Sequence, residues 1–113
     1  MRTQQEICVC HKPPIHHSDY EISFLGVDKT NGRFAEVTIE KCKHCGTEWI
    51  NYLVENEAFT RSGRWYRGIL ENGQGKIKPE NVETYLENLD WYIFGGSYFN
   101  STGKTGKGTL VVN

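Results

Sequence analysis

The chain has 113 residues, and its 13 Lys and Arg nearly balance its 14 Asp and Glu, for a formal net charge of −1. This length predicts a single domain, 1–113, and the balanced charge argues against a general nucleic-acid coat and against a disordered acidic tail. Hydrophobic residues make up 37% of the chain and large rings are frequent among them, which predicts a thin core. No apolar run approaches the roughly 18 residues of a membrane helix, and the polar residues 1–6 lack the apolar region of a signal peptide. We therefore expect a cytoplasmic protein with no membrane partner.

The four cysteines fall in two close pairs, a C-x-C pair at 8–10 and a C-x-x-C pair at 42–45. In a secreted chain four cysteines would first suggest two disulfides, but a reducing compartment disfavours them. Paired thiols there favour a tetrahedral thiolate site, because a C-x-x-C turn lets two thiolates converge on one ion. Zinc is the predicted cofactor, and iron is possible because four thiolates also hold iron. The predicted metal ligands are Cys8, Cys10, Cys42 and Cys45.

The segment from Cys42 to Gly46 resembles the C-x-x-C-G knuckle of the zinc-ribbon superfamily, and it lies between two strand-like segments. Gly46 fits such a knuckle because glycine tolerates the positive φ of a sharp turn. The resemblance is one of architecture and covers about residues 8–54. It implies three antiparallel strands pinned by a closed four-cysteine zinc site. An inserted hairpin would account for the 31 residues between the pairs, against a commoner spacing of about 15 to 20.

Residues 11–19 contain two prolines and are expected to form a loop. A strand is predicted at 20–27 and another at 34–40, joined by a turn whose Asn-Gly step suits a hairpin. A third strand is predicted at 47–54, after the knuckle. In the first strand, we expect one face to carry Tyr20, Ile22 and Phe24, and the other to carry Leu25 and Val27.

The remaining part, about 55–113, is built differently. Residues 59–70 indicate a bent strand or hairpin. A helix is predicted from Pro79, because Val82, Leu86 and Leu89 recur at helical spacing, and its apolar stripe should pack on the sheet. Residues 91–94 are predicted to form a buried strand, and residues 109–112 a last short strand. Between them, residues 97–108 are predicted to form a glycine-rich loop, which either packs its rings on the core or forms a ligand cleft. The predicted fold class is α+β, with a small antiparallel sheet, a zinc-ribbon-like four-cysteine site and one C-terminal-half helix packed on the sheet.

Two stretches are candidates for a binding surface. Between 61 and 78, three arginines surround Trp65 and Tyr66, and Lys76 and Lys78 follow. This composition suits stacking on unpaired bases and contact with phosphates. The competing interpretation is a structural strand whose arginines pair with the acidic residues of the following helix. The second stretch, 91–108, combines glycines with aromatic rings. The candidate surface residues are Arg61, Arg64, Trp65, Tyr66, Arg67, Tyr98 and Phe99.

The leading hypothesis is a zinc-binding domain that acts as a protein-interaction module. The zinc site itself would not catalyse a reaction, because a closed four-thiolate site leaves no position for a reactive water. One alternative is a single-stranded nucleic-acid-binding ribbon that uses residues 61–78. Another is an enzyme in which a histidine, such as His11 or His44, completes an open Cys/His zinc site. Redox catalysis is disfavoured, because a strand and not a helix follows the C-x-x-C pair.

Overall fold

The computed structural model describes residue 10 and residues 15–30, 34–55, 63–70, 77–99, 101–108 and 110, without the side chains of residues 98, 101 and 102. One antiparallel sheet of six strands forms its centre, and the strand order follows the chain. The strands are β1 (Tyr20–Asp28), β2 (Ala35–Cys42), β3 (Glu48–Val54), β4 (Arg64–Ile69), β5 (Trp91–Gly96) and β6 (Ser101–Lys107). The helical segments are the 3-10 turns η2 (His17–Asp19), η4 (Pro79–Asn81) and η5 (Ser97–Phe99), and the helix α1 (Val82–Glu87).

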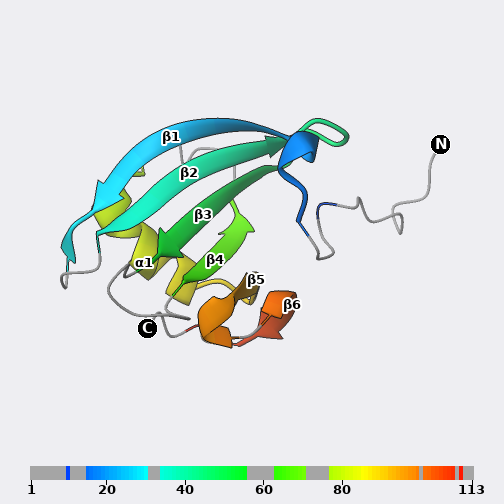
Figure 1. Cartoon of the computed structure of the whole chain (residues 1–113). Helices are drawn as coiled ribbons and strands as arrows, with labels where there is room; N and C mark the ends of the chain where they lie inside the picture. The colour runs from blue at the N-terminus through cyan, green and yellow to red at the C-terminus, as the bar shows by residue number, and fades with distance from the viewer. Residues whose placement is uncertain are drawn as a thin grey trace.

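The first three strands confirm the antiparallel hairpin and the third strand that the alternation predicts. In Figure 1 they form the long curved part of the sheet. Their register places Tyr20 opposite Cys42, and Glu40 opposite Trp49. The C-x-x-C segment therefore forms the connection between β2 and β3, at one end of the sheet. No helix among the described residues is long and apolar enough to cross a membrane.

One predicted face in β1 is wrong. The register shifts between Phe24 and Gly26, which is a β-bulge. Because a bulge adds one residue to one strand, it reverses the alternation that follows. Val27 pairs with Glu36 and so lies on the same face as Phe24, whereas Leu25 packs against the core on the opposite side.

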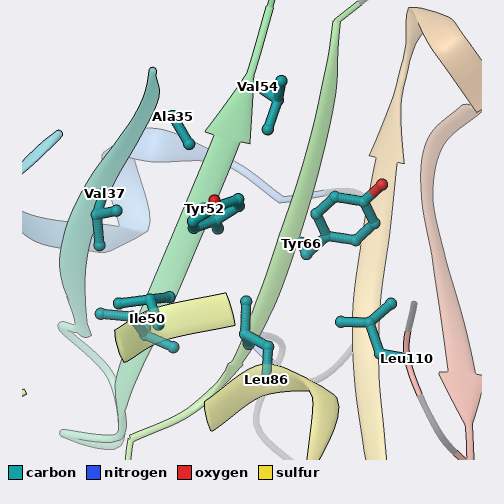
Figure 2. Packing of buried hydrophobic residues seen from close by; sticks show 9 residues of the cluster. Ala35, Val37, Ile50, Tyr52, Val54, Tyr66, Leu86 and Leu110 are labelled. Atoms are coloured by element: carbon teal, nitrogen blue, oxygen red, sulfur yellow. The ribbon is translucent and has the colours of Figure 1, made fainter. Parts of the chain in front are cut away.

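We call the two faces of the sheet the helix face and the cysteine face, and each carries a buried cluster. On the helix face, Val37, Tyr52 and Tyr66 lie side by side across β2, β3 and β4. The predicted apolar stripe of the helix packs here, since Val82 and Leu86 are buried in the same cluster. Figure 2 shows Leu86 among these residues. The cysteine face carries a second buried cluster, which contains Cys10, Tyr20, Cys42, Trp49 and Ile93.

The glycine-rich tail is a strand, not the loop that its composition predicts. β6 pairs with β5, placing Gly106 opposite Tyr92 and Lys104 opposite Phe94. A Cβ atom on Gly106 would lie 2.5 Å from the Tyr92 ring, so the glycine makes room for a ring on the neighbouring strand. Most of the predicted strand at 109–112 lies outside the described residues, and Leu110, which is described, is buried but not in a strand.

Candidate metal centre

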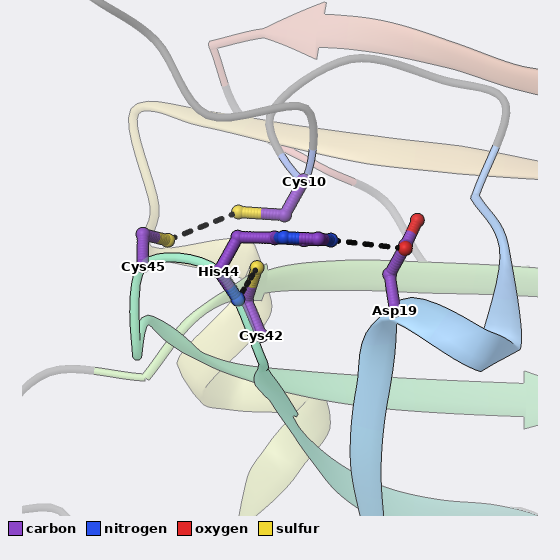
Figure 3. A network of polar contacts seen from close by, with 5 residues as sticks. All are labelled: Cys10, Asp19, Cys42, His44 and Cys45. Carbon is purple, nitrogen blue, oxygen red and sulfur yellow. Dashed lines mark hydrogen bonds and ion pairs between the residues drawn. The ribbon is translucent and has the colours of Figure 1, made fainter.

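Three cysteines from distant parts of the sequence meet at one end of the cysteine face. Cys42 is the last residue of β2, Cys45 lies in the turn that follows, and Cys10 approaches from the N-terminal side (Figure 3). Their three Sγ atoms all lie within 4.8 Å of one another, and the Sγ atoms of Cys10 and Cys45 are 3.6 Å apart. None of the three is in a disulfide. This cluster could hold a metal ion.

The backbone around Cys42 folds into a compact turn that presents two of these sulfurs. The Cys42 N–H donates to the Thr47 carbonyl at 2.8 Å, and the Gly46 N–H donates to the Cys42 carbonyl at 2.9 Å. Gly46 has a φ of 80°, the left-handed conformation that glycine adopts without steric cost. The N–H of His44 points at Cys42 Sγ at 3.4 Å, a contact that stabilises sulfur when it is a thiolate.

The burial of the sulfurs differs across the cluster. Cys10 and Cys42 are each 1% exposed, whereas Cys45 is exposed to solvent. Cys45 Sγ lies 3.1 Å from Thr47 Oγ1, so this hydroxyl can donate to the sulfur once the thiol has lost its proton. Two buried thiolates in apolar surroundings would be costly without a counter-charge. A divalent ion that prefers sulfur supplies this charge, and the donor set therefore fits zinc or iron.

The described histidines do not join the sulfur cluster. The His44 side chain turns toward η2, where its Nε2 lies 3.1 Å from Asp19 Oδ1, and it is 56% exposed (Figure 3). This contact ties the knuckle to the start of β1, as does the N–H of Lys43, which donates to the Asp19 carbonyl. His16 and His17 are exposed. His11 lies outside the described residues.

Aromatic side chains line the sheet beneath the sulfurs. Trp49 is fully buried and meets Trp91 edge to face, with ring centroids 6.0 Å apart. Burial raises the pKa of Tyr20 to about 12, and the nearby Arg67 charge acts in the opposite direction, whereas Cys10, Cys42 and Glu40 add to the rise. Tyr20 therefore keeps its proton at neutral pH.

A buried ion pair lies on the same face, and the sequence pattern does not indicate it. Arg67 Nη1 donates to Glu40 Oε1 at 2.7 Å and to Asn51 Oδ1 at 3.3 Å. The Thr38 hydroxyl donates to the second Glu40 oxygen at 3.0 Å. Alternation assigns Glu40 to the polar side of its strand, but the register between β2, β3 and β4 is needed to bring Arg67 to it.

The structure corrects the predicted surface at two residues. Tyr66 and Arg67 are 1% and 2% exposed. β4 lies between β3 and β5, where Tyr66 joins the cluster on the helix face and Arg67 lies against Tyr20 and Trp49 on the cysteine face. Phe99 is half-buried and packs edge to face on Tyr66 at 6.0 Å. Arg64 and Trp65 are also half-buried. Arg67 pairs with Glu40 of the sheet, not with an acidic residue of the helix.

Two further predicted residues, Cys8 and Arg61, lie outside the described residues, and of Tyr98 only the backbone is described.

No protein-family model matches the sequence, and comparisons with curated proteins and with solved structures find no match. The zinc-ribbon resemblance therefore depends on the knuckle sequence and on the three clustered sulfurs alone. Function must be inferred from this geometry.

Proposed function

We propose that this protein is a zinc-binding module with a structural thiolate centre. The observation that carries the proposal is the convergence of the Cys10, Cys42 and Cys45 sulfurs within 4.8 Å. Cys8, which is two residues from Cys10, is proposed as the fourth ligand. Its sequence position suits this role, since the chain near Cys10 already reaches the cluster.

The role of the ion in this proposal is structural. Zinc would join the segment at Cys10 to the end of β2 and the turn that follows it, although 31 residues lie between Cys10 and Cys42 in the sequence. Because such a site does not exist in the unfolded chain, the free energy of binding the metal becomes free energy of folding. A zinc ion with four thiolate ligands has no open position for water, so it would not itself catalyse a reaction.

Beyond the metal, we propose that the module binds another protein. Ile22 and Phe24 on β1 are 45% and 64% exposed and lie on the same face of the sheet. β1 is an edge strand, and an edge strand with exposed apolar side chains is a common site for adding a partner strand. Nucleic-acid binding through 61–78 has less support, because Tyr66 and Arg67 are buried.

The metal proposal is tested by metal content and by binding to single-residue variants. The full chain, purified under reducing conditions, is expected to contain about one zinc ion per molecule and to be colourless. Iron would instead colour the protein. After removal of the metal, Cys42→Ser is expected to bind zinc much more weakly than the unmodified chain, because one thiolate ligand is lost.

His44→Ala is the matched control, since His44 lies within the same turn but its side chain contacts Asp19. This variant should retain the zinc stoichiometry of the unmodified protein. The proposal is wrong if the purified chain binds no metal, or if Cys42→Ser keeps full affinity. Loss of zinc from the His44 variant would favour the alternative of an open Cys/His site.

A further inference from the structure

A metal centre with three or four thiolate ligands carries a net negative charge, which is unfavourable in a buried site. When Zn²⁺ displaces the protons of three or four thiols, the site gains a net negative charge of about one or two. Cys10 and Cys42 are buried, and a buried net charge is costly unless an opposite charge lies near it. A buried cation near the sulfurs would supply this opposite charge.

Arg67 is that cation. The buried charged residues of the described chain are Asp28, Glu40 and Arg67. Asp28 lies at the far end of β1 from the cysteines, where it accepts hydrogen bonds from Tyr52 and Thr30. Arg67 lies on the cysteine face, together with Glu40.

The Arg67 side chain reaches toward the sulfur cluster. Its Cα is in register with Asn51 of β3, and Asn51 is in register with Thr38 of β2, four residues before Cys42. From there the guanidinium carbon reaches a position 4.9 Å from the centre of the Tyr20 ring and 5.4 Å from that of Trp49. Tyr20 is the direct strand neighbour of Cys42. Tyr20 and Trp49 therefore contact the guanidinium and belong to the same buried cluster as Cys10 and Cys42.

The hydrogen bonds of Arg67 leave most of its guanidinium unused. Nη1 binds Glu40 and Asn51, whereas the buried Nε and Nη2 atoms have no hydrogen-bond partner among the described residues. Glu40 is more fully satisfied, because it also accepts from Thr38. A buried Arg–Glu pair is weak evidence for fold stability, since apolar residues of similar size often serve as well. The pair at this position therefore calls for another role.

We propose that Arg67 is a positioning residue for the metal centre, whose buried charge stabilises the thiolate–metal complex across the Tyr20 and Trp49 rings. Glu40 holds the guanidinium in place through Nη1. Because the Glu40 carboxylate is negative, it also reduces the stabilisation that the Arg67 charge gives to the metal centre. The inference depends on the proposed function, because it concerns the affinity of the same site.

The test compares zinc affinities of charge variants by competition with a chromophoric chelator. Arg67→Met should bind zinc more weakly than the unmodified chain, by a factor on the order of 10, because a buried positive charge near the site is lost. Arg67→Lys keeps the charge and should recover most of that loss. Glu40→Gln removes a negative charge and keeps the shape, and it should bind zinc more tightly than the unmodified chain.

The opposite signs separate a charge effect from a loss of structure. A purely structural pair would lower the affinity in both Arg67→Met and Glu40→Gln, and would make Arg67→Lys as weak as Arg67→Met. Either result overturns the inference. If Arg67→Met does not fold, the double variant with Glu40→Met replaces the whole pair by apolar groups, a change that buried pairs often tolerate. Its affinity should not exceed that of Glu40→Gln, and a higher value also contradicts the inference.

The zinc affinity of the unmodified chain distinguishes failure of this inference from failure of the proposed function. If the unmodified chain binds no zinc, the metal proposal itself is wrong. If the unmodified chain binds zinc tightly and the charge variants do not diverge in sign, the metal centre stands and Arg67 has no part in its affinity.

Discussion

At the scale of single residues, buried polar groups on both faces of the sheet are paired across strands. On the cysteine face the pair is Arg67 with Glu40, and on the helix face it is Tyr52 with Asp28. Asp28 is fully buried and ends β1, while Tyr52 lies in the middle of β3. Thr30 supplies two more hydrogen bonds to the same carboxylate, from its backbone N–H and its hydroxyl. This network fixes the end of β1 against the core.

Tyr52→Phe tests that network. The change removes one donor to a fully buried carboxylate, so we expect the free energy of unfolding to fall by about 1 to 3 kcal/mol. Urea unfolding monitored by circular dichroism measures it. Tyr85→Phe is the control, since its hydroxyl donates to the carbonyl of Ile69 in a half-buried place. An equal loss of unfolding free energy in both variants would show that the hydrogen bond to the buried carboxylate stabilises the fold no more than the bond to the half-buried carbonyl.

The cysteine cluster could be proposed from the sequence, because the close spacing within each pair indicates thiols that can share one metal ion. The partners of Arg67 could not. Four residues on three strands make its surroundings, namely Tyr20, Glu40, Trp49 and Asn51. Their proximity follows from strand register, which a local pattern does not encode. For the same reason, the basic-aromatic run at 64–67 was predicted as a surface and proves to be partly core.

At the scale of elements, α1 depends on the sheet. It has six residues, which is too short for a helix to be stable in water by itself. Its contact with β4 is close because Gly68 faces it. A Cβ at Gly68 would lie 2.2 Å from Leu89 Cδ1 and 3.2 Å from Leu86 Cδ2. The glycine therefore lets the helix end approach the strand.

A double-mutant cycle tests this approach. Gly68→Ala should reduce the free energy of unfolding by about 1 to 3 kcal/mol, the usual cost of overpacking. In the background of Leu89→Ala, where the obstructing methyl groups are gone, the same change should cost less. Thermal unfolding of the unmodified chain, the two single variants and the double variant gives the coupling free energy between positions 68 and 89. Additive losses would mean that Leu89 does not limit the contact.

Elements defined by local alternation or by helical spacing were predictable, and elements defined by contact with a neighbour were not. β2 alternates apolar and polar residues from Ala35 to Glu40, and the helix shows its stripe of Val82 and Leu86. β6 has the composition of a loop. Gly106 accommodates the Tyr92 ring of the neighbouring strand β5, and this relationship appears only when the two strands are side by side.

At the scale of the whole molecule, one sheet has a different cover on each face. The helix face is closed by α1 and by Leu110, and the cysteine face is covered near the sulfurs by Cys10 and Ile15. The α+β class and the antiparallel sheet follow from the sequence. The burial of residues on the cysteine face could not be predicted from the sequence. It depends on aromatic rings and an ion pair that strands from both halves of the chain contribute.

The central claim is that the clustered sulfurs hold a zinc ion with a closed shell of thiolates. X-ray absorption at the zinc edge of the purified full chain tests it most directly, since it counts the ligand atoms and identifies them. We predict four sulfur atoms at about 2.3 Å. A shell with nitrogen and an oxygen atom, or a protein without zinc, would contradict this claim and return attention to the histidines.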